Sequence, residues 1–194
     1  MSELTCCAIS TWHPDFVAAI HRHYTRSRGA PPGKKMAWRI SLEGETIGWF
    51  GLGEPAYKLA PRRRLGLEDA RPAPLTVGNF IFRLEREAAE PAASDVLRQL
   101  LPVFLGDWEA RYGWMPLHLE TLVDPGEVGG EREDHVAGYA YRRAGFRSLG
   151  MTTGRSARRP PGATHGARIW SDSTPKLVLY RGPLARLPAP TATT

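Results

Sequence analysis

The stretch LTVGNFIFRLE, residues 75–85, decides the fold, because its β-branched and aromatic side chains alternate as they do in a strand. Apolar residues then recur at helical spacing from residue 90 to residue 113, which predicts a long helix. The short apolar run PLHLETLV, residues 116–123, predicts a buried strand. One helix therefore crosses from a long strand to its neighbour. This order predicts an α/β or α+β domain with a mixed central sheet flanked by helices.

The flanking segments extend this order on both sides. The predicted elements are a helix at 13–26, a hairpin at 36–53, a loop at 54–74, a short helix at 136–145, a strand at 146–154, a loop at 154–168 and a last strand at 176–181. A chain of 194 residues, 42% of them apolar, suits one domain. We expect that domain to span residues 1–182 and the end, residues 183–194, to be disordered.

Composition argues against several classes of protein. No run of eighteen apolar residues exists to span a bilayer, and the first residues lack the basic start and long apolar run of a signal peptide. The two cysteines, Cys6 and Cys7, are adjacent, so they close no useful loop and supply no zinc framework. We therefore expect a cytoplasmic protein with no membrane partner.

The formal net charge of +6 hides an uneven distribution. Residues 101–141 carry eight acidic and two basic residues, a net of −6, whereas residues 142–194 carry ten basic and one acidic residue, a net of +9. Clustered arginine is typical of phosphate binding, and the alternative is a GC-rich genome that encodes arginine in place of lysine. On the first interpretation the partner is double-stranded DNA, held through its backbone by Arg62, Arg63, Arg64, Arg142, Arg143, Arg155, Arg158 and Arg159.

The segment YRRAGF, residues 141–146, resembles the C-terminal signature of the GNAT-like acyltransferases, and the strand, helix and strand before it fit the same family. The resemblance implies a GNAT-like fold with Tyr141 as a general acid, since a phenol stays protonated at neutral pH. The alternative is that Tyr141 only packs its short helix. That family binds the pyrophosphate of acetyl-CoA with a glycine-rich turn, but the matching turn here, residues 90–95, has two acidic residues, one proline and no glycine. We therefore expect acetyl-CoA not to bind in the ordinary way, if it binds at all.

A wider resemblance covers residues 17–181. Its segments are HRHY (21–24), VGNFIFRL (77–84), ASDVLR (93–98), HLETLVDP (118–125), YRRAGF (141–146) and GMTTGR (150–155). As an ordered set they resemble the Mom DNA-modification proteins of phage Mu and their relatives, a divergent GNAT-like group related to the DruA proteins of Druantia defence systems. The resemblance implies transfer of a carbamoylmethyl-type group from a small-molecule donor to the N6 amine of adenine in DNA, which protects phage DNA from restriction.

The same resemblance implies functional residues at Tyr24, Arg83, Ser94, Asp124 and Tyr141, although the acidic insertion after Asp124 is longer than in the family. Arg83 interrupts an apolar strand, so its partner is either Glu120 on the next strand or the phosphate or carboxylate of a cofactor. Ser94 is either a helix cap or a hydroxyl of the site, which makes Arg83 and Ser94 the candidate cofactor ligands. Asp124 either starts a turn or lies at a strand end, where α/β sites form.

The same segments offer a metal site. His23, Tyr24, Asp124 and Tyr141 supply oxygen and nitrogen ligands suited to iron, and an iron requirement fits the resemblance to Mom. The alternative is a surface histidine beside a core tyrosine. His118 interrupts an apolar strand, and we expect it to be a core histidine with its hydrogen bonds satisfied.

The leading hypothesis is therefore a DNA-modifying transferase acting on adenine. The first alternative is a conventional GNAT N-acyltransferase acting on an amine of a small molecule or peptide. The second alternative is a non-catalytic DNA-binding accessory protein of a defence system. An enzyme that modifies adenine must take the base out of the helix, and the aromatic residues that could stack on it, if they are not core, are Trp38, Trp49, Tyr57 and Trp170.

Overall fold

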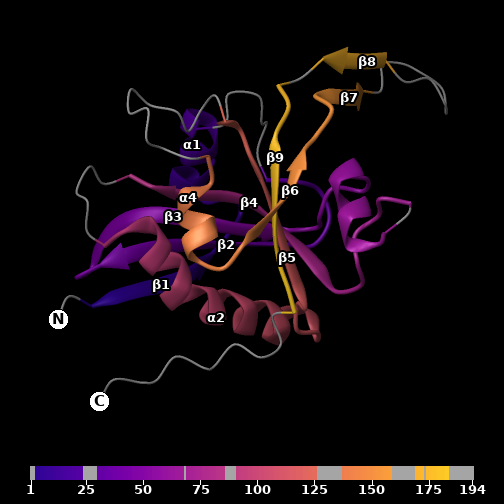
Figure 1. The fold of residues 1–194 in the computed structure, drawn as a ribbon. Helices are drawn as coiled ribbons and strands as arrows, with labels where there is room; N and C mark the ends of the chain where they lie inside the picture. The colour runs from indigo at the N-terminus through magenta and orange to yellow at the C-terminus, as the bar shows by residue number, and fades with distance from the viewer. Residues whose placement is uncertain are drawn as a thin grey trace.

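The computed structural model describes residues 3–23, 30–67, 69–85, 91–125, 137–158, 169–172 and 174–183. Figure 1 shows these residues arranged as a sheet with helices on both sides. None of the helices among them is long and apolar enough to cross a membrane. In chain order the elements are β1 (Leu4–Ile9), α1 (Pro14–His23), β2 (Lys35–Leu42), β3 (Glu45–Gly53), the 3-10 helix η1 (Ala60–Leu65), β4 (Thr76–Leu84), α2 (Ala93–Tyr112), β5 (His118–Val123), α4 (Tyr139–Arg143), β6 (Arg147–Met151), β7 (Arg155–Arg158), β8 (Ile169–Asp172) and β9 (Leu177–Arg181).

Among the described residues, seven strands form one sheet in the order β1-β2-β3-β4-β5-β9-β6. Neighbouring strands are antiparallel except for β4 and β5, which are parallel and joined by α2. The prediction of an α/β domain with a mixed central sheet flanked by helices is confirmed. β7 and β8 form a separate ribbon that projects beyond β6 and β9 (Figure 1). The sequence patterns predicted neither this ribbon nor β1, an edge strand with little buried surface to give it a pattern.

Different helices cover the two faces of the sheet, because successive side chains of a strand point to opposite faces. On the α2 face, Trp38 and Phe50 pack against Phe104 of α2, and the rings of Phe50 and Phe104 stack with 4.1 Å between their centroids. On the α1 face, Phe16 of α1 packs against Trp49. η1 covers the part of the α1 face that β5, β9 and β6 form. The middle of the α1 face lies between α1 and η1.

β4 contains one extra residue, Phe80. In its pairing with β3, Leu52 lies opposite Asn79 and Gly51 lies opposite Ile81, so Phe80 is left over between them. Such a bulge shifts the alternation of the strand. Asn79 therefore shares the α2 face with Leu52, whereas Ile81 packs in the cluster on the α1 face.

β4 and β5 are hydrogen-bonded partners over only part of their length. Their parallel ladder joins Thr76–Asn79 to His118–Thr121. Beyond it, β4 continues beside β3 and β5 continues beside β9. The two strands therefore separate after the pair Asn79–Thr121 and leave an opening in the middle of the sheet.

η1 lies where the sequence predicts a loop, and its Arg62 side chain is 0% exposed. The guanidinium donates to the two carboxylate oxygens of Glu120, at 2.8 Å and 2.6 Å. It also donates to the backbone carbonyls of Ala56, Tyr57 and Ala70. This buried ion pair holds η1 and the segments on both sides of it against β5.

At this point one sequence prediction is wrong, and one of two alternatives is excluded. Arg62 does not reach a DNA backbone, because its side chain is enclosed and its donors are bound to Glu120 and carbonyl oxygens. Arg83 is not the partner of Glu120. It lies opposite Trp49 near the end of β4, where its side chain is exposed.

Breaking the ion pair is expected to leave one buried charge without its partner. We predict that Arg62→Met or Glu120→Gln lowers the free energy of unfolding by about 3–5 kcal/mol, measured by urea denaturation. The double variant Arg62→Met/Glu120→Leu should lose less than the two single losses together, because no charge is then left buried. Arg63→Met, at the exposed neighbour, is the control and should change stability by about 0.5 kcal/mol or less. Equal effects at the two arginines would contradict the structural role of Arg62.

Candidate functional site

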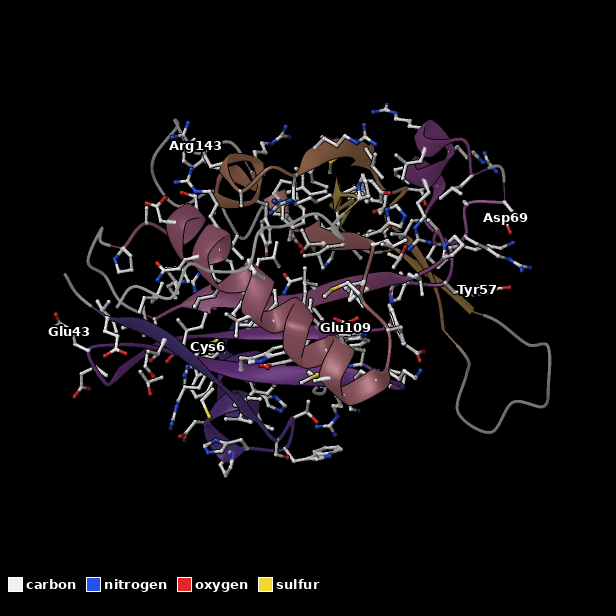
Figure 2. The ribbon with its side chains drawn as sticks, turned by 90° about the horizontal axis from the view of Figure 1, so that it is seen from below. Cys6, Glu43, Tyr57, Asp69, Glu109 and Arg143 are labelled. Carbon is white, nitrogen blue, oxygen red and sulfur yellow. The ribbon has the colours of Figure 1, made fainter. Side chains whose placement is uncertain are left out.

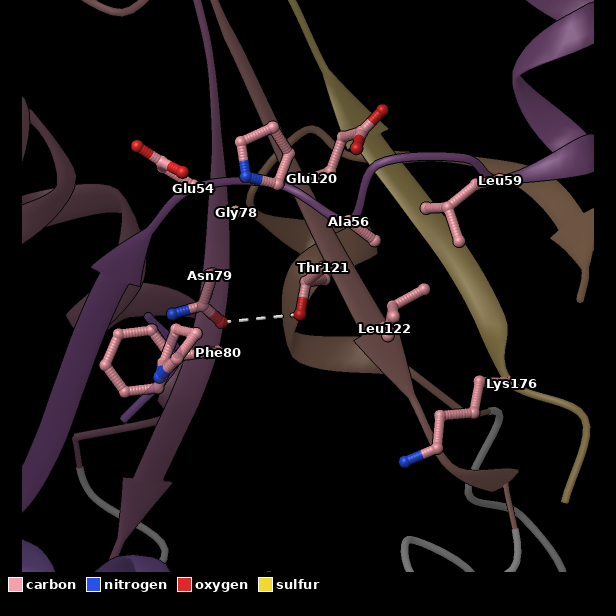
Figure 3. A pocket seen from close by; sticks show the side chains of 12 residues that line it. Glu54, Ala56, Leu59, Gly78, Asn79, Phe80, Glu120, Thr121, Leu122 and Lys176 are labelled. Atoms are coloured by element: carbon pink, nitrogen blue, oxygen red, sulfur yellow. Dashed lines mark hydrogen bonds between the residues drawn. The ribbon is translucent and has the colours of Figure 1, made fainter. Parts of the chain in front are cut away.

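Three polar side chains meet where β4 and β5 separate. Asn79 and Thr121 lie opposite each other in the last pair of the parallel ladder. The hydroxyl of Tyr141 lies 2.6 Å from Oδ1 of Asn79, and the hydroxyl of Thr121 lies 3.3 Å from the same oxygen. Figure 3 shows the bond between Asn79 and Thr121 bridging the two strands. We call these three residues the strand-gap cluster.

The orientation of the Asn79 carboxamide follows from its other two bonds. Its Nδ2 donates to the backbone carbonyls of Gly51, at 2.9 Å, and Ile81, at 2.8 Å. A flipped amide would set its oxygen against these two carbonyl oxygens, so Oδ1 must face the hydroxyls. Because Oδ1 only accepts, the hydroxyl of Tyr141 is the donor in its bond to Asn79.

Tyr141 is held in place by packing on the α2 face. Its ring makes edge contacts with Phe82 of β4, at 5.9 Å between centroids, and with Phe146, at 5.3 Å. α4 begins after Gly138, whose φ of 74° is left-handed and whose added Cβ would lie 2.4 Å from the side chain of Leu179. The start of this short helix is therefore fixed against the sheet, and with it the direction of the Tyr141 side chain.

A cavity of about 310 Å³ lies at the same separation of the strands, between the segment that leads into η1 and the sheet. The chain at Pro55 crosses close over β4, since a Cβ added to Gly78 would lie 3.2 Å from the Pro55 Cα. Figure 3 shows Lys176 and Glu54 at opposite ends of the lining. The lining is mostly apolar and consists of Pro31, Glu54, Pro55, Ala56, Leu59, Gly78, Asn79, Phe80, Glu120, Thr121, Leu122 and Lys176.

The structure separates the residues that the resemblance to Mom groups together. Tyr141 belongs to the strand-gap cluster, and Asp124 follows β5 directly and is half-buried. Arg83 shares the α1 face with Trp49, whereas Tyr141 packs on the α2 face. Tyr24 lies outside the described residues. The roles of these residues in a reaction remain predictions.

Ser94 is buried in the first turn of α2, and the helix is preceded by Ala92 without a side-chain cap. The alternative that Ser94 caps the helix is therefore wrong, because Ser94 lies two residues after the N-cap position, inside the first turn. Asp95 forms an ion pair with Arg98 on the same helix. Its negative charge is thus balanced locally, which weakens the sequence argument that this turn repels a phosphate.

The predicted iron site is not assembled within the described part of the chain. There, no group of three or more His, Cys, Asp or Glu side chains lies close enough to hold a metal ion. His23 ends α1, but its side chain is not described, and Tyr24 is outside the described residues. The iron set stays a prediction.

Apart from the buried Arg62, the basic residues proposed for DNA fall into two groups. Arg63 and Arg64 of η1 and Arg142 and Arg143 of α4 are exposed, and Figure 2 shows Arg143 pointing outward. Arg64 lies over Gly150 of β6. Contact of these residues with DNA stays a prediction. For three others the side chains lie outside the described part of the chain: Arg155 and Arg158, which belong to β7, and Arg159.

Two of the four aromatic residues considered for stacking on a base belong to the core. Trp38 and Trp49 are buried there, which is the alternative stated for them, and they cannot stack on a base. Tyr57 is 67% exposed and points outward in Figure 2, whereas the side chain of Trp170 is not described.

The sequence patterns did not identify Asn79 and Thr121 as residues of the site. The feature that could have identified them is that each is a polar residue in the middle of an apolar strand segment.

His118 has a partner, as expected of a core histidine. The hydroxyl of Tyr180 lies 2.5 Å from its Nδ1, and the two rings stack with 5.5 Å between centroids. Burial lowers the pKa of His118, and the nearby carboxylate of Glu120 opposes this more weakly. Burial also raises the pKa of Tyr180, so the phenol is the donor and the histidine is held in its neutral form.

Comparison with known proteins finds no matching family model and no similar curated protein. Solved structures are similar over most of both chains. Aminoglycoside 6′-acetyltransferase type Ii is 11% identical, with a TM-score of 0.49 over 94% of this chain and 99% of that chain. A Bacillus subtilis acetyltransferase in complex with CoA is 11% identical, with a TM-score of 0.47 over 93% and 99%. A GNAT family acetyltransferase from Elizabethkingia anophelis with acetyl-CoA bound is 12% identical, with a TM-score of 0.47 over 92% and 97%. At these identities and TM-scores we take no function from the likeness.

The lowered pKa of His118 predicts a specific dependence of stability on pH. The folded state binds fewer protons at His118 than the unfolded state, whose pKa is near 6.5, so the stabilisation is present above that pH and is lost as the pH falls through and below it. The free energy of unfolding should therefore drop more between pH 7.5 and pH 5 in the wild type than in His118→Gln, measured by urea denaturation. The same drop in both proteins would show that His118 does not titrate with folding.

Proposed function

We propose that this protein transfers an acyl group from a thioester donor to an amine. The observation that carries the proposal is the strand-gap cluster, which sets a proton-donating tyrosine at the only parallel strand pair of the described sheet, with a cavity at the same separation. A donor that enters the gap can meet Tyr141 from the α2 face. An amine can reach the same point from the cavity. This is the arrangement that acyl transfer between two ligands needs.

The open edges of β4 and β5 suit an extended donor with amide groups. Past Asn79 and Thr121 the two strands no longer pair with each other, so amides between them can form strand-like hydrogen bonds. CoA has such an arm, followed by phosphates. The N-terminus of α2 lies next to α4, with its exposed arginines Arg142 and Arg143, and both features favour phosphate. The pairing of Asp95 with Arg98 removes part of the sequence argument against acetyl-CoA.

The amine would attack the thioester carbonyl, the carbon–sulfur bond would break, and Tyr141 would give its proton to the departing thiolate. The amine nitrogen would lose one proton as the amide forms, and a proton would return to the Tyr141 phenolate through solvent. The mostly apolar cavity suits an amine in its neutral, nucleophilic form. General acid catalysis of this kind contributes about 10²- to 10⁴-fold to a rate.

The first test is release of free thiol from acetyl-CoA in the presence of a panel of primary amines, followed with a thiol-reactive dye. We predict that Tyr141→Phe lowers kcat about 10²-fold or more, because the acid is lost while the ring is kept. Tyr139→Phe, exposed on the same helix, is the matched control and should behave as the wild type. Undetectable CoA binding by calorimetry, or full activity of Tyr141→Phe, would overturn this function.

A second candidate function is that the amine is N6 of adenine in DNA. It is favoured by the exposed arginines beside β6, an edge strand of the sheet: Arg63, Arg64, Arg142, Arg143 and Arg147. They come from η1 on one face, α4 on the other and β6 itself, so a polyanion could lie along this edge. In this reading the transferred group would be carbamoylmethyl-like and would protect DNA from restriction. Because a thioester delivers an acyl group and carbamoylmethyl is an alkyl group, this reaction would need a different small-molecule donor.

Nucleoside mass spectrometry of DNA from cells that express the protein decides between the two acceptors. For DNA as acceptor we expect a modified deoxyadenosine that disappears in Tyr141→Phe. The triple variant Arg63→Ala/Arg64→Ala/Arg147→Ala should reduce the slope of log K against log salt by about 2 to 3, since each phosphate contact contributes about 0.9. The control is Arg22→Ala, because Arg22 of α1 forms an ion pair with Glu85. An unaltered deoxyadenosine profile with soluble, folded protein would exclude this candidate.

A further inference from the structure

Two hydroxyl groups share one acceptor in the strand-gap cluster, and they share it unequally. Oδ1 of Asn79 accepts from Tyr141 at 2.6 Å and from Thr121 at 3.3 Å. A carboxamide oxygen has two lone pairs, so it accommodates both donors. At these lengths the bond from Tyr141 is the strong one and the bond from Thr121 is the weak one.

Asn79 cannot turn to relieve this arrangement. Both hydrogens of its Nδ2 are bound to carbonyl oxygens, those of Gly51 and Ile81. The side chain is also buried, so the loss of a donor at Oδ1 is costly. The proton of Tyr141 is therefore committed to Asn79 while the protein is at rest.

We propose that Thr121 is a positioning residue for Tyr141: its hydroxyl is the reserve donor that takes over Oδ1 of Asn79 when Tyr141 turns its proton toward a leaving group. This inference rests on the proposed acyl transfer. The bond at 3.3 Å has room to shorten, and Thr121 is on the strand opposite Asn79, fixed by the ladder. Without a reserve donor, each proton transfer from Tyr141 would leave a buried oxygen without a partner.

The exchange keeps the protons in balance. The O–H bond of Tyr141 breaks, and its proton bonds to the departing sulfur. The new amide nitrogen releases one proton, and through solvent a proton returns to the Tyr141 phenolate. The Thr121 proton stays on its own oxygen throughout and only changes the strength of its bond to Oδ1. Tyr141 then returns to Asn79, and the bond from Thr121 lengthens again.

A stability cycle tests the shared acceptor without any catalysis. In Thr121→Val or Tyr141→Phe alone, Oδ1 of Asn79 keeps the other donor, so each single effect should be small. In the double variant Oδ1 loses both. We expect its unfolding equilibrium constant to exceed the product of the two single effects by about 5- to 30-fold, measured by urea denaturation. Additive effects in the cycle would overturn the inference, whatever the activity of the protein.

The kinetic arm uses thiol release from acetyl-CoA. Thr121→Val should lower kcat about tenfold and leave KM unchanged, and Thr121→Ser, which keeps the hydroxyl, should restore most of the rate. In a Tyr141→Phe background the same substitution should have no further effect, because no proton is then moved. A tenfold loss in both backgrounds would overturn the inference. A non-additive stability cycle in a protein that releases no thiol would leave the shared acceptor standing and would reject the proposed function alone.

Discussion

The buried ion pair between Arg62 and Glu120 is the interaction on which the geometry of the site depends. Each buried charge costs several kcal/mol to dehydrate, and the pair compensates only because its geometry is bidentate and the remaining donors reach carbonyl oxygens. Those carbonyls belong to Ala56, Tyr57 and Ala70, so the pair ties the segments before and after η1 to β5. The wall of the cavity is therefore fixed to the same strand that carries Thr121. An apolar pair of equal size could fill the space, but it would leave these carbonyls without donors.

The second constraint is the end of the parallel ladder. Inside a continuous sheet the two faces are isolated from each other, because the backbone between them is closed by hydrogen bonds. Where β4 leaves β5 this barrier is interrupted, and groups from both faces can act on one point. Tyr141 reaches it from the α2 face, and the cavity reaches it from under the segment leading into η1. Ligand sites of open α/β sheets form where strands separate for this reason.

The sequence predicted the parts of the fold that depend on local periodicity, such as the strand, helix and strand from β4 to β5 and the hairpin before them. It also singled out Tyr141, whose helix and following strand are adjacent along the chain. It failed where a side chain's surroundings are set by distant pairing. Arg62 is buried because Glu120, 58 positions away, is delivered to it by the sheet. The four partners of Asn79 come from β3, β4, β5 and α4, and no local pattern joins them.

The extra residue in β4 has a consequence for how this strand can change. Because Phe80 lies outside the ladder, the residues of β4 that face α2 have odd numbers up to Asn79 and even numbers from Phe82 onward. If Phe80 joined the ladder, every position up to Leu84 would move to the opposite face, which would bring Arg83 beside the ring of Tyr141 and turn Ile81 away from α1. Removing Phe80 would instead close the bulge and leave these residues on their present faces. The faces that Ile81 to Leu84 present therefore depend on Phe80 staying outside the ladder.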